Sequence, residues 1–267
     1  MQRVAAAGHL AVRRTAGRTR LARLFQEGAA KIRMPAVTDD LFEAVLINTA
    51  GGLTGGDRLA WRVDVGEGAA ASVTTQACEK VYRAAEDRAG VWCNLHVGRE
   101  ASLAWLPQET IVYRGGALSR RFEVDLDAGA RLLMVEATVF GRTAMGENVD
   151  RGTFRDRWRI RRAGRLIHAE DFSLGPEIAV TLARGAVTAG APAMATVLLV
   201  EDEPGRHLDA ARSILGDRGG ASVWSVGGSG KLLARLVGDD GYSLRKRLVS
   251  LVGLLNGKAG LPKTWSL

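Results

Sequence analysis

The sequence is poor in residues that build disulfides and metal sites. Its 267 residues include two cysteines, Cys78 and Cys93, and four histidines. Two cysteines exclude the disulfide-dense scaffold of small secreted proteins, and their separation fits no zinc pattern. The histidines lie far apart, and none forms a helical i, i+4 pair. This shortage of ligands in metal spacing disfavours a tightly bound metal ion.

Long apolar runs are also absent. No stretch approaches the roughly 18 uninterrupted apolar residues of a membrane span. Arg13-Arg14 near the N-terminus is not followed by an apolar segment long enough for a secretory or twin-arginine signal. We therefore expect a cytoplasmic protein without a membrane partner.

The sequence lacks a convincing nucleotide-binding loop. Gly66-x-Gly68-x-x-Ala71 imitates a dinucleotide fingerprint, but the β-branched residues after it favour a strand over the required helix. Lys231 follows a glycine as in a Walker A loop, yet Leu232 stands where that loop needs Ser or Thr. These patterns predict no nucleotide cofactor.

Acidic residues are in deficit. The chain has 37 Lys and Arg against 29 Asp and Glu, which gives a formal net charge of +8. A basic excess favours anionic partners. The arginines are scattered and no nucleic-acid reader motif accompanies them, so we expect no nucleic acid partner. An acidic protein partner remains open.

The most regular feature that is present is an internal repeat. Residues 65–69, 97–101 and 126–130 each join two strand-like runs, and their terminal alanines give a repeat of about thirty residues. Residues 91–97 alternate apolar and polar side chains, which is the period of a half-buried strand. Stacked strand–turn–strand units of this length predict a mainly β fold that is layered or solenoid-like.

Helices are expected only near the end of the chain. Residues 204–215 and 242–255 place apolar side chains at helical spacing, which predicts about two α-helices in the C-terminal third. Residues 178–200 look β-rich. No long polar or Pro/Ser-rich linker interrupts the chain, so we expect a single domain over 1–267.

Two glycine pairs, Gly51-Gly52 and Gly55-Gly56, separate apolar runs on either side. Glycine pairs allow positive φ angles and close backbone approach, so they predict a sharp structural turn. Asp57 follows directly, and it would either fix the turn or face a wet interior.

Three carboxylates stand in or beside apolar runs: Glu109, Glu136 and Glu147. A carboxylate in an apolar strand costs several kcal/mol unless it is paired, hydrated or metal-bound. Pairing with an arginine such as Arg142 is one explanation, and a wet channel for a hard or borderline cation is another. An enzyme that uses Glu109 or Glu136 as acid/base is the rival reading, but no Gly-x-Ser-x-Gly elbow supports it.

An ordered series of distinctive segments runs along nearly the whole chain: residues 17–21, 51–57, 74–77, 80–83, 105–111, 140–147 and 261–265. This series resembles the urease accessory protein family UreD, called UreH in some bacteria. Thr49-Ala50 and Gln76-Ala77 depart from that pattern, where prolines or Pro-Gly are common.

The resemblance implies a mostly β-stranded scaffold with two helices, not an enzyme. It implies binding to a UreF-type accessory protein, through it to a UreG-type GTPase, and to apo-urease. Nickel would be handled transiently, with GTP hydrolysis left to the GTPase.

The resemblance also implies an internal polar tunnel and a partner surface. The lining candidates are polar residues on strands or beside them: Asp64, Thr74, Thr75, Glu136, Glu147 and Glu170. The partner-binding candidates come from the last predicted helix and the C-terminal tail: Tyr242, Arg245, Leu248, Leu251 and Trp265. The alternative for the leucines is that they are simply core.

Overall fold

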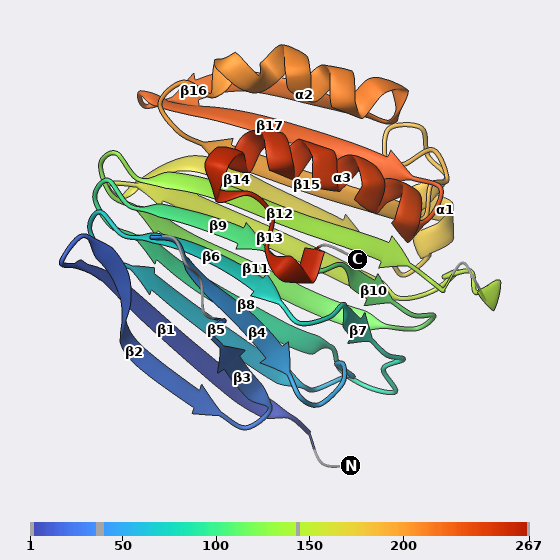
Figure 1. Cartoon of the computed structure of the whole chain (residues 1–267). Helices are drawn as coiled ribbons and strands as arrows, with labels where there is room; N and C mark the ends of the chain where they lie inside the picture. Colours follow the sequence, from blue (N-terminus) through green and yellow to red (C-terminus); the bar gives the residue numbers. More distant parts are fainter. Residues whose placement is uncertain (1–2, 36–39, 143–144, 266–267) are drawn as a thin grey trace.

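The chain forms two β-sheets that lie face to face, and its two longest helices cover the outside of one of them (Figure 1). This arrangement is seen in a computed structural model that describes residues 3–35, 40–142 and 145–265. Part of the segment at 140–147 that carries the family resemblance, Thr143 and Ala144, lies outside the described residues. The mainly β, layered fold expected from the sequence is confirmed.

One sheet has seven strands and mixes parallel and antiparallel pairs. Its inner strands are mutually parallel, and antiparallel hairpins close both edges. In spatial order the strands are β14 (Arg165–Leu174), β13 (Thr153–Arg162), β11 (Ala117–Leu126), β8 (Ala89–Val97), β5 (Arg58–Val65), β1 (Ala5–Thr15) and β2 (Arg18–Glu27).

The second sheet has ten strands. Two short strands, β7 (Glu79–Val81) and β10 (Thr110–Val112), pair with each other beside β12. The remaining strands are, in spatial order, β16 (Gly219–Val226), β17 (Ser229–Gly238), β15 (Ala193–Val200), β12 (Arg131–Phe140), β9 (Ser102–Leu106), β6 (Ala70–Thr75), β4 (Phe42–Asn48) and β3 (Ala30–Arg33).

The internal repeat is the solenoid-like part of the fold. In each repeat a strand of the seven-stranded sheet turns into a strand of the other sheet: β5 into β6, β8 into β9 and β11 into β12. The turns stack in register, because the Gly98 N–H donates to the Val65 carbonyl at 2.8 Å and the Asp127 N–H donates to the Val97 carbonyl at 2.9 Å. Equal repeat lengths therefore keep equivalent residues side by side.

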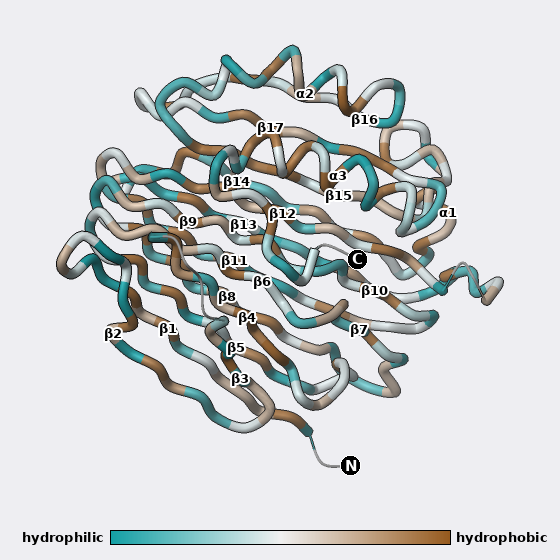
Figure 2. The backbone as a smooth tube through the Cα atoms, viewed as in Figure 1, coloured by the Kyte–Doolittle hydropathy of each residue, from teal (hydrophilic) through white to brown (hydrophobic). Residues whose placement is uncertain are grey.

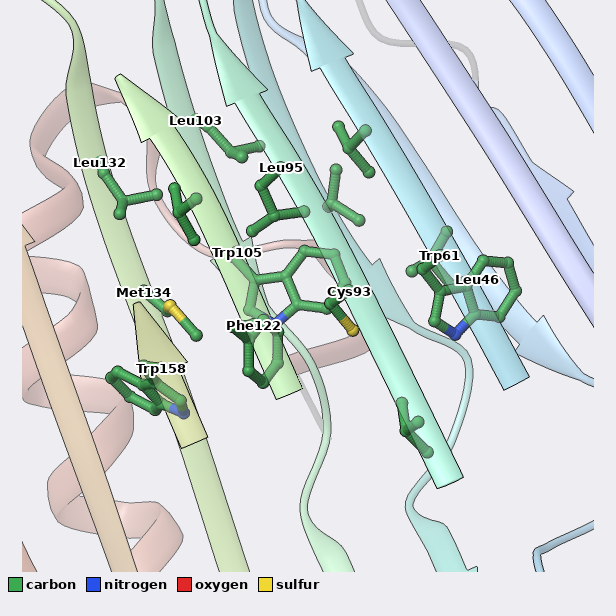
Figure 3. Packing of buried hydrophobic residues seen from close by; sticks show 14 of the residues in the cluster. Leu46, Trp61, Cys93, Leu95, Leu103, Trp105, Phe122, Leu132, Met134 and Trp158 are labelled. Atoms are coloured by element: carbon green, nitrogen blue, oxygen red, sulfur yellow. The ribbon is translucent and has the colours of Figure 1, made fainter. Parts of the chain in front are cut away.

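Alternating side chains fill the space between the sheets. Along most strands apolar and polar residues follow one another at short intervals (Figure 2), and the apolar set faces the opposite sheet. Aromatic rings pack edge to face at the centre (Figure 3): Trp105 and Phe122 have centroids 5.6 Å apart, and Phe122 and Trp158 are 6.0 Å apart. The period of two residues thus creates the core directly.

The two expected helices lie on the outer face of the ten-stranded sheet. They are α2 (Leu208–Leu215), which follows the short 3-10 turn Pro204–His207, and α3 (Gly241–Asn256). The carboxylate of Asp240 caps α3 by accepting from the Ser243 N–H at 2.6 Å. Such a cap satisfies one of the unpaired amides of the first turn.

The expectation for residues 178–200 was only partly right. Strand β15 occupies the end of this stretch, but α1 (Ile178–Leu182) is a helix that buries Ile178 and Leu182 in the core. The spacing of four residues between these two side chains fits a helical turn. A short apolar run in a sequence is compatible with either a helix or a strand, and tertiary contacts determine which one forms.

The glycine turn forms a sharp backbone crossing at the N-terminal end of β5. Gly51, Gly52 and Gly56 have φ angles of 77°, 147° and 85°, and a Cβ on Gly55 would lie 2.2 Å from the Glu86 carbonyl oxygen. The buried carboxylate of Asp57 holds the turn, since it accepts from the backbone N–H groups of Val4 and Thr54 at 2.9 and 2.8 Å.

We expect Gly55→Val to destabilise the fold by at least about 2 kcal/mol, because the added side chain has no room against the backbone around Glu86. Gly51→Asn is the matched control. Position 51 has open space around a Cβ, and asparagine tolerates a positive φ, so its cost should stay within about 1 kcal/mol. Urea-induced unfolding measures both. Equal stability of the two variants would contradict the close-approach argument.

Candidate interior polar site

A charged cluster lies buried between the two sheets. The guanidinium of Arg120 contacts both carboxylate oxygens of Asp156, at 3.1 and 2.6 Å, and also pairs with Glu136. Glu136 accepts a further hydrogen bond from the indole N–H of Trp105 at 2.9 Å, and Arg120 donates to the Thr110 hydroxyl at 3.2 Å. All of these side chains are at most 7% exposed.

Strand register brings the cluster together. Arg120 on β11 and Asp156 on β13 are direct partners in a parallel pair, and both point inward. Glu136 comes from β12 of the opposite sheet, where it shares the inward face with the buried residues Met134 and Thr138. The ion pairs therefore join the two layers at the centre of the core.

The cluster holds two carboxylates against one guanidinium. Burial acts to lower the pKa of Arg120, but the charges of Asp156 and Glu136 outweigh it and raise that pKa. Burial raises the pKa of Glu136 despite the attraction of Arg120. A cation or a proton near Glu136 would therefore relieve an excess of buried negative charge.

A small cavity of about 60 Å³ opens beside this cluster. Figure 3 shows Cys93, Trp105 and Phe122 close together and Trp61 beside Leu46, and all five residues line this cavity. The wall of this cavity is mostly apolar, and a few polar side chains point into it. Its polar lining consists of Thr75, Glu79, Gln108, Thr110, Arg120 and Glu136.

The interior cavity adjoins a second cavity of about 150 Å³ that reaches Gly51 of the glycine turn. Both cavities share Thr75 and Glu79 in their walls. A groove of about 310 Å³ lies nearby and shares Gln108 with the interior cavity and Cys78 with the second one. The three spaces are neighbours that share lining residues, and each has a few polar side chains in its wall.

Glu79, at the junction of two cavities, was missed from the sequence. Its carboxylate accepts from the side-chain amide of Asn48 at 3.1 and 3.2 Å. Burial raises the pKa of Glu79 to about 7. Strand period offered a signal, because Val81 two residues later is fully buried and residues i and i+2 share a face.

Two of the six predicted lining residues, Thr75 and Glu136, do line the interior cavity. The Thr75 hydroxyl accepts from the Gln108 N–H at 2.8 Å and so holds one wall of the junction. Thr74 points to the opposite face of β6, where its hydroxyl lies 3.1 Å from that of Thr264 in the C-terminal turn Lys263–Trp265.

The other three predicted lining residues lie elsewhere. Asp64 faces outward on β5 and binds the side chains of His9 and Arg62 at 2.6 and 2.9 Å. Glu147 lies in the segment after β12 and pairs with Arg142 at 2.7 Å, the pairing that its neighbourhood suggested. The alternation of side chains along a strand explains why Asp64 faces outward, because its neighbours Val63 and Val65 are buried.

Glu170 lies at the far edge of the two-sheet interior. It pairs with Arg235 of β17 at 2.5 Å, and neither side chain lines the interior cavity. The six candidates therefore do not form one site.

Glu109 and Glu136 do not form an acid/base pair. Glu109 lines the outer groove and is neutralised by Arg245 at 2.8 Å, whereas Glu136 lines the interior cavity. The nearest thiol, Cys78, donates to Glu109 at 3.4 Å. Burial and the Glu109 carboxylate raise the pKa of this thiol to about 11, so it stays protonated and unreactive near neutral pH.

Three of the predicted partner-binding residues are core residues instead. Leu248, Leu251 and Trp265 are 1%, 0% and 3% exposed, since α3 and the C-terminal turn pack on the ten-stranded sheet. Arg245 is used internally by Glu109 and stacks 5.1 Å from the Trp265 ring. Tyr242 is 79% exposed and is available to a partner.

Among residues 3–35, 40–142 and 145–265, no group of three or more His, Cys, Asp or Glu side chains is arranged to hold a metal ion. The same part of the chain contains no helix long and apolar enough to cross a membrane.

We expect Glu79→Gln to change how stability depends on pH. The folded-state pKa of about 7 exceeds the ordinary 4.5, so the folded protein retains a proton that the unfolded chain loses. Stability should therefore fall as pH rises from about 4.5 to 7, and glutamine should remove up to about 3 kcal/mol of that fall. Urea unfolding at pH 5 and pH 8 measures the difference. The exposed Glu67→Gln is the control, and matching profiles for both variants would refute a buried titration at Glu79.

Comparison with known proteins places this architecture in a family. A family profile described as UreD urease accessory protein matches residues 4–266. The chain is 62% identical over 266 residues to a Mesorhizobium japonicum protein named Urease accessory protein UreD, covering 100% of this chain and 95% of that protein. A Brucella suis protein of the same name is 55% identical over 267 residues, covering 100% and 96%. The chain belongs to the UreD family of urease accessory proteins.

Proposed function

We propose that this chain is a non-catalytic scaffold that passes nickel through its interior to apo-urease. The observation that carries the proposal is the pair of neighbouring cavities between the glycine turn and the buried Glu136, which share the polar side chains of Thr75 and Glu79 in their walls. Nickel is the cargo of this process and is not a resident cofactor of the chain.

The cavity chemistry suits a cation in transit. Carboxylate, hydroxyl and amide oxygens bind a borderline cation less tightly than imidazole or thiolate sets do. Glu79, Thr75 and Gln108 offer such oxygens at the junction, and Glu136 offers one inside. Weak, successive contacts favour passage, because a tight site would retain the ion.

The charge of Arg120 limits how strongly the interior attracts a cation. Its charge cancels one of the two buried carboxylates, which leaves an attraction for a cation that is real but limited. The cation would displace the proton that burial favours on Glu136. Ion entry and proton release are thereby linked.

We further propose that a UreF-type partner, which carries a UreG-type GTPase, binds at the outer groove beside α3. Tyr242 projects from the first turn of α3, and Ile111 and Arg142 lie in the same groove wall. An exposed aromatic next to an arginine is the composition of a protein interface centre.

Glu136→Gln and Thr75→Val should each lower urease activation about fivefold or more, which corresponds to roughly 1 kcal/mol of lost cation attraction. The assay co-expresses each variant with urease and the other accessory genes and measures activity and nickel content of purified urease. Glu67→Gln is the control, because Glu67 is exposed and lines none of the three cavities. Assembly of each variant with the partner proteins, measured by pull-down, should stay at the wild-type level. Normal nickel loading with Glu136→Gln and Thr75→Val would sink the interior route.

Tyr242→Ala should weaken binding of the UreF-type partner about tenfold or more without loss of thermal stability, since the side chain is 79% exposed. Isothermal titration of the two purified proteins measures the affinity. Leu21→Ala on β2, 41% exposed on the other sheet, is the control. An unchanged affinity for Tyr242→Ala would exclude the groove as the binding surface.

A further inference from the structure

The outer face of the seven-stranded sheet carries an ordered pattern of side chains. Cross-strand register places Ala60, Trp92, Arg121 and Arg157 in one row across β5, β8, β11 and β13. The neighbouring row holds Arg58, Gly90, Ser119 and Arg155 on the same strands. These two rows bring arginines from three strands around a single tryptophan.

Trp92 lies flat on the sheet. A Cβ on Gly90 would lie 2.2 Å from the indole ring of Trp92, so the ring occupies the space that a side chain at position 90 would fill. The indole is still 38% exposed. A large aromatic fixed in place and open to solvent on one side is ready for contact at little entropic cost.

Three of the four arginines in these rows lack internal partners. Within the described residues, the side chains of Arg58, Arg121 and Arg155 form no hydrogen bond or ion pair, and all three are exposed. Arg157 has one long contact to Asp171 at 3.8 Å. We call Arg58, Trp92, Arg121, Arg155 and Arg157 the Trp92 surface.

Further along the same four strands the outward-facing arginines are neutralised. Arg62 pairs with Asp64 at 2.9 Å, and Arg161 pairs with Glu123 at 2.7 Å. On β5, β8, β11 and β13 the arginines that are unpaired within the described residues therefore lie at the end of the strands next to the glycine turn, whereas the likewise unpaired Arg20 and Arg23 lie on the edge strand β2. Unpaired cations around an aromatic match a partner surface rich in Asp and Glu.

We propose that the Trp92 surface docks on an acidic face of apo-urease. This inference rests on the proposed function, in which the chain needs one surface for the accessory partner and another for the recipient of the metal. The groove at Tyr242 lies beside α3, on the outer side of the ten-stranded sheet. The Trp92 surface lies on the opposite side of the molecule.

The position of the Trp92 surface supports apo-urease as its occupant. It borders the glycine turn, because the Gly90 N–H donates to the Asp57 carbonyl at 2.8 Å and Arg58 follows Asp57 directly. Gly51 of the same turn lines the outer of the two neighbouring cavities. A protein docked on the Trp92 surface would thus lie next to an opening of the interior route.

The same pattern fits a nucleic acid less well. Carboxylates of Glu123, Asp125 and Asp171 lie on adjoining positions of the same sheet face, where they would repel a phosphate backbone. A protein surface that mixes acidic and basic groups can match both signs at once.

The test compares two charge-reversal variants that differ only in location. Arg121→Glu combined with Arg155→Glu should weaken binding of the full chain to purified nickel-free urease about tenfold or more, and Trp92→Ser should do the same. Arg20→Glu combined with Arg23→Glu on β2 makes the same change in net charge on the same sheet and should bind as the wild type does. Biolayer interferometry at two salt concentrations gives the affinities, and circular dichroism melts check the fold.

Each outcome decides the assignment. Wild-type affinity in both Trp92-surface variants, with the wild type binding and activating urease, overturns this inference and leaves the proposed function intact. Equal weakening by the β2 control means general charge attraction and also overturns it. If the Trp92-surface variants lose binding to duplex DNA and keep their binding to urease, the surface is reassigned to nucleic acid. Failure of the wild type to bind apo-urease, even with the UreF-type partner present, contradicts the proposed function and this inference together.

Discussion

The parallel register of β8, β11 and β13 is the constraint on which the rest of the structure depends. It places Arg120 directly beside Asp156, and the stacked turns then bring Glu136 of β12 over the same point. A slip of one residue would turn Arg120 outward and Arg121 inward, leaving two buried carboxylates without a cation. The same register builds the Trp92 surface on the opposite face of these strands. One hydrogen-bonding pattern thus organises both the interior site and the outer face.

A buried ion cluster at the centre of an apolar core joins the two sheets at a large cost in desolvation free energy. Well-packed apolar residues of similar volume often give equal or greater stability. The contacts of Arg120 with Asp156, Glu136 and Thr110 satisfy its guanidinium, yet the cluster still carries more carboxylates than cations. The cost of this cluster and the small cavity beside it are what the proposed cation route would explain.

Much of the fold could be predicted because its signals are local and repeated. The thirty-residue repeat, the period of two in residues 91–97 and the leucine spacing of α3 each followed from a physical periodicity. The site was harder, since a carboxylate in an apolar strand shows that it needs a partner without showing which one. Glu136 was found in this way, but its partner Arg120 lies on another strand, and Asp64 was assigned to the wrong face. The stripe of Leu248 and Leu251 likewise fits a core helix and a docking helix equally well until the sheet beneath it is seen.

The glycine turn affects the start of β5, the outer cavity and the Trp92 surface. Its positive φ angles and the buried Asp57 fix where β5 begins, and β5 sets the register of Arg58 against Gly90 and of Ala60 against Trp92. Gly51, a few residues earlier, forms part of the wall of the outer cavity. A change in the turn would therefore move the cavity opening and the Trp92 surface together. Segments without catalytic chemistry can be constrained for this reason, because they place two surfaces, here the proposed cavity opening and the proposed docking surface, relative to each other.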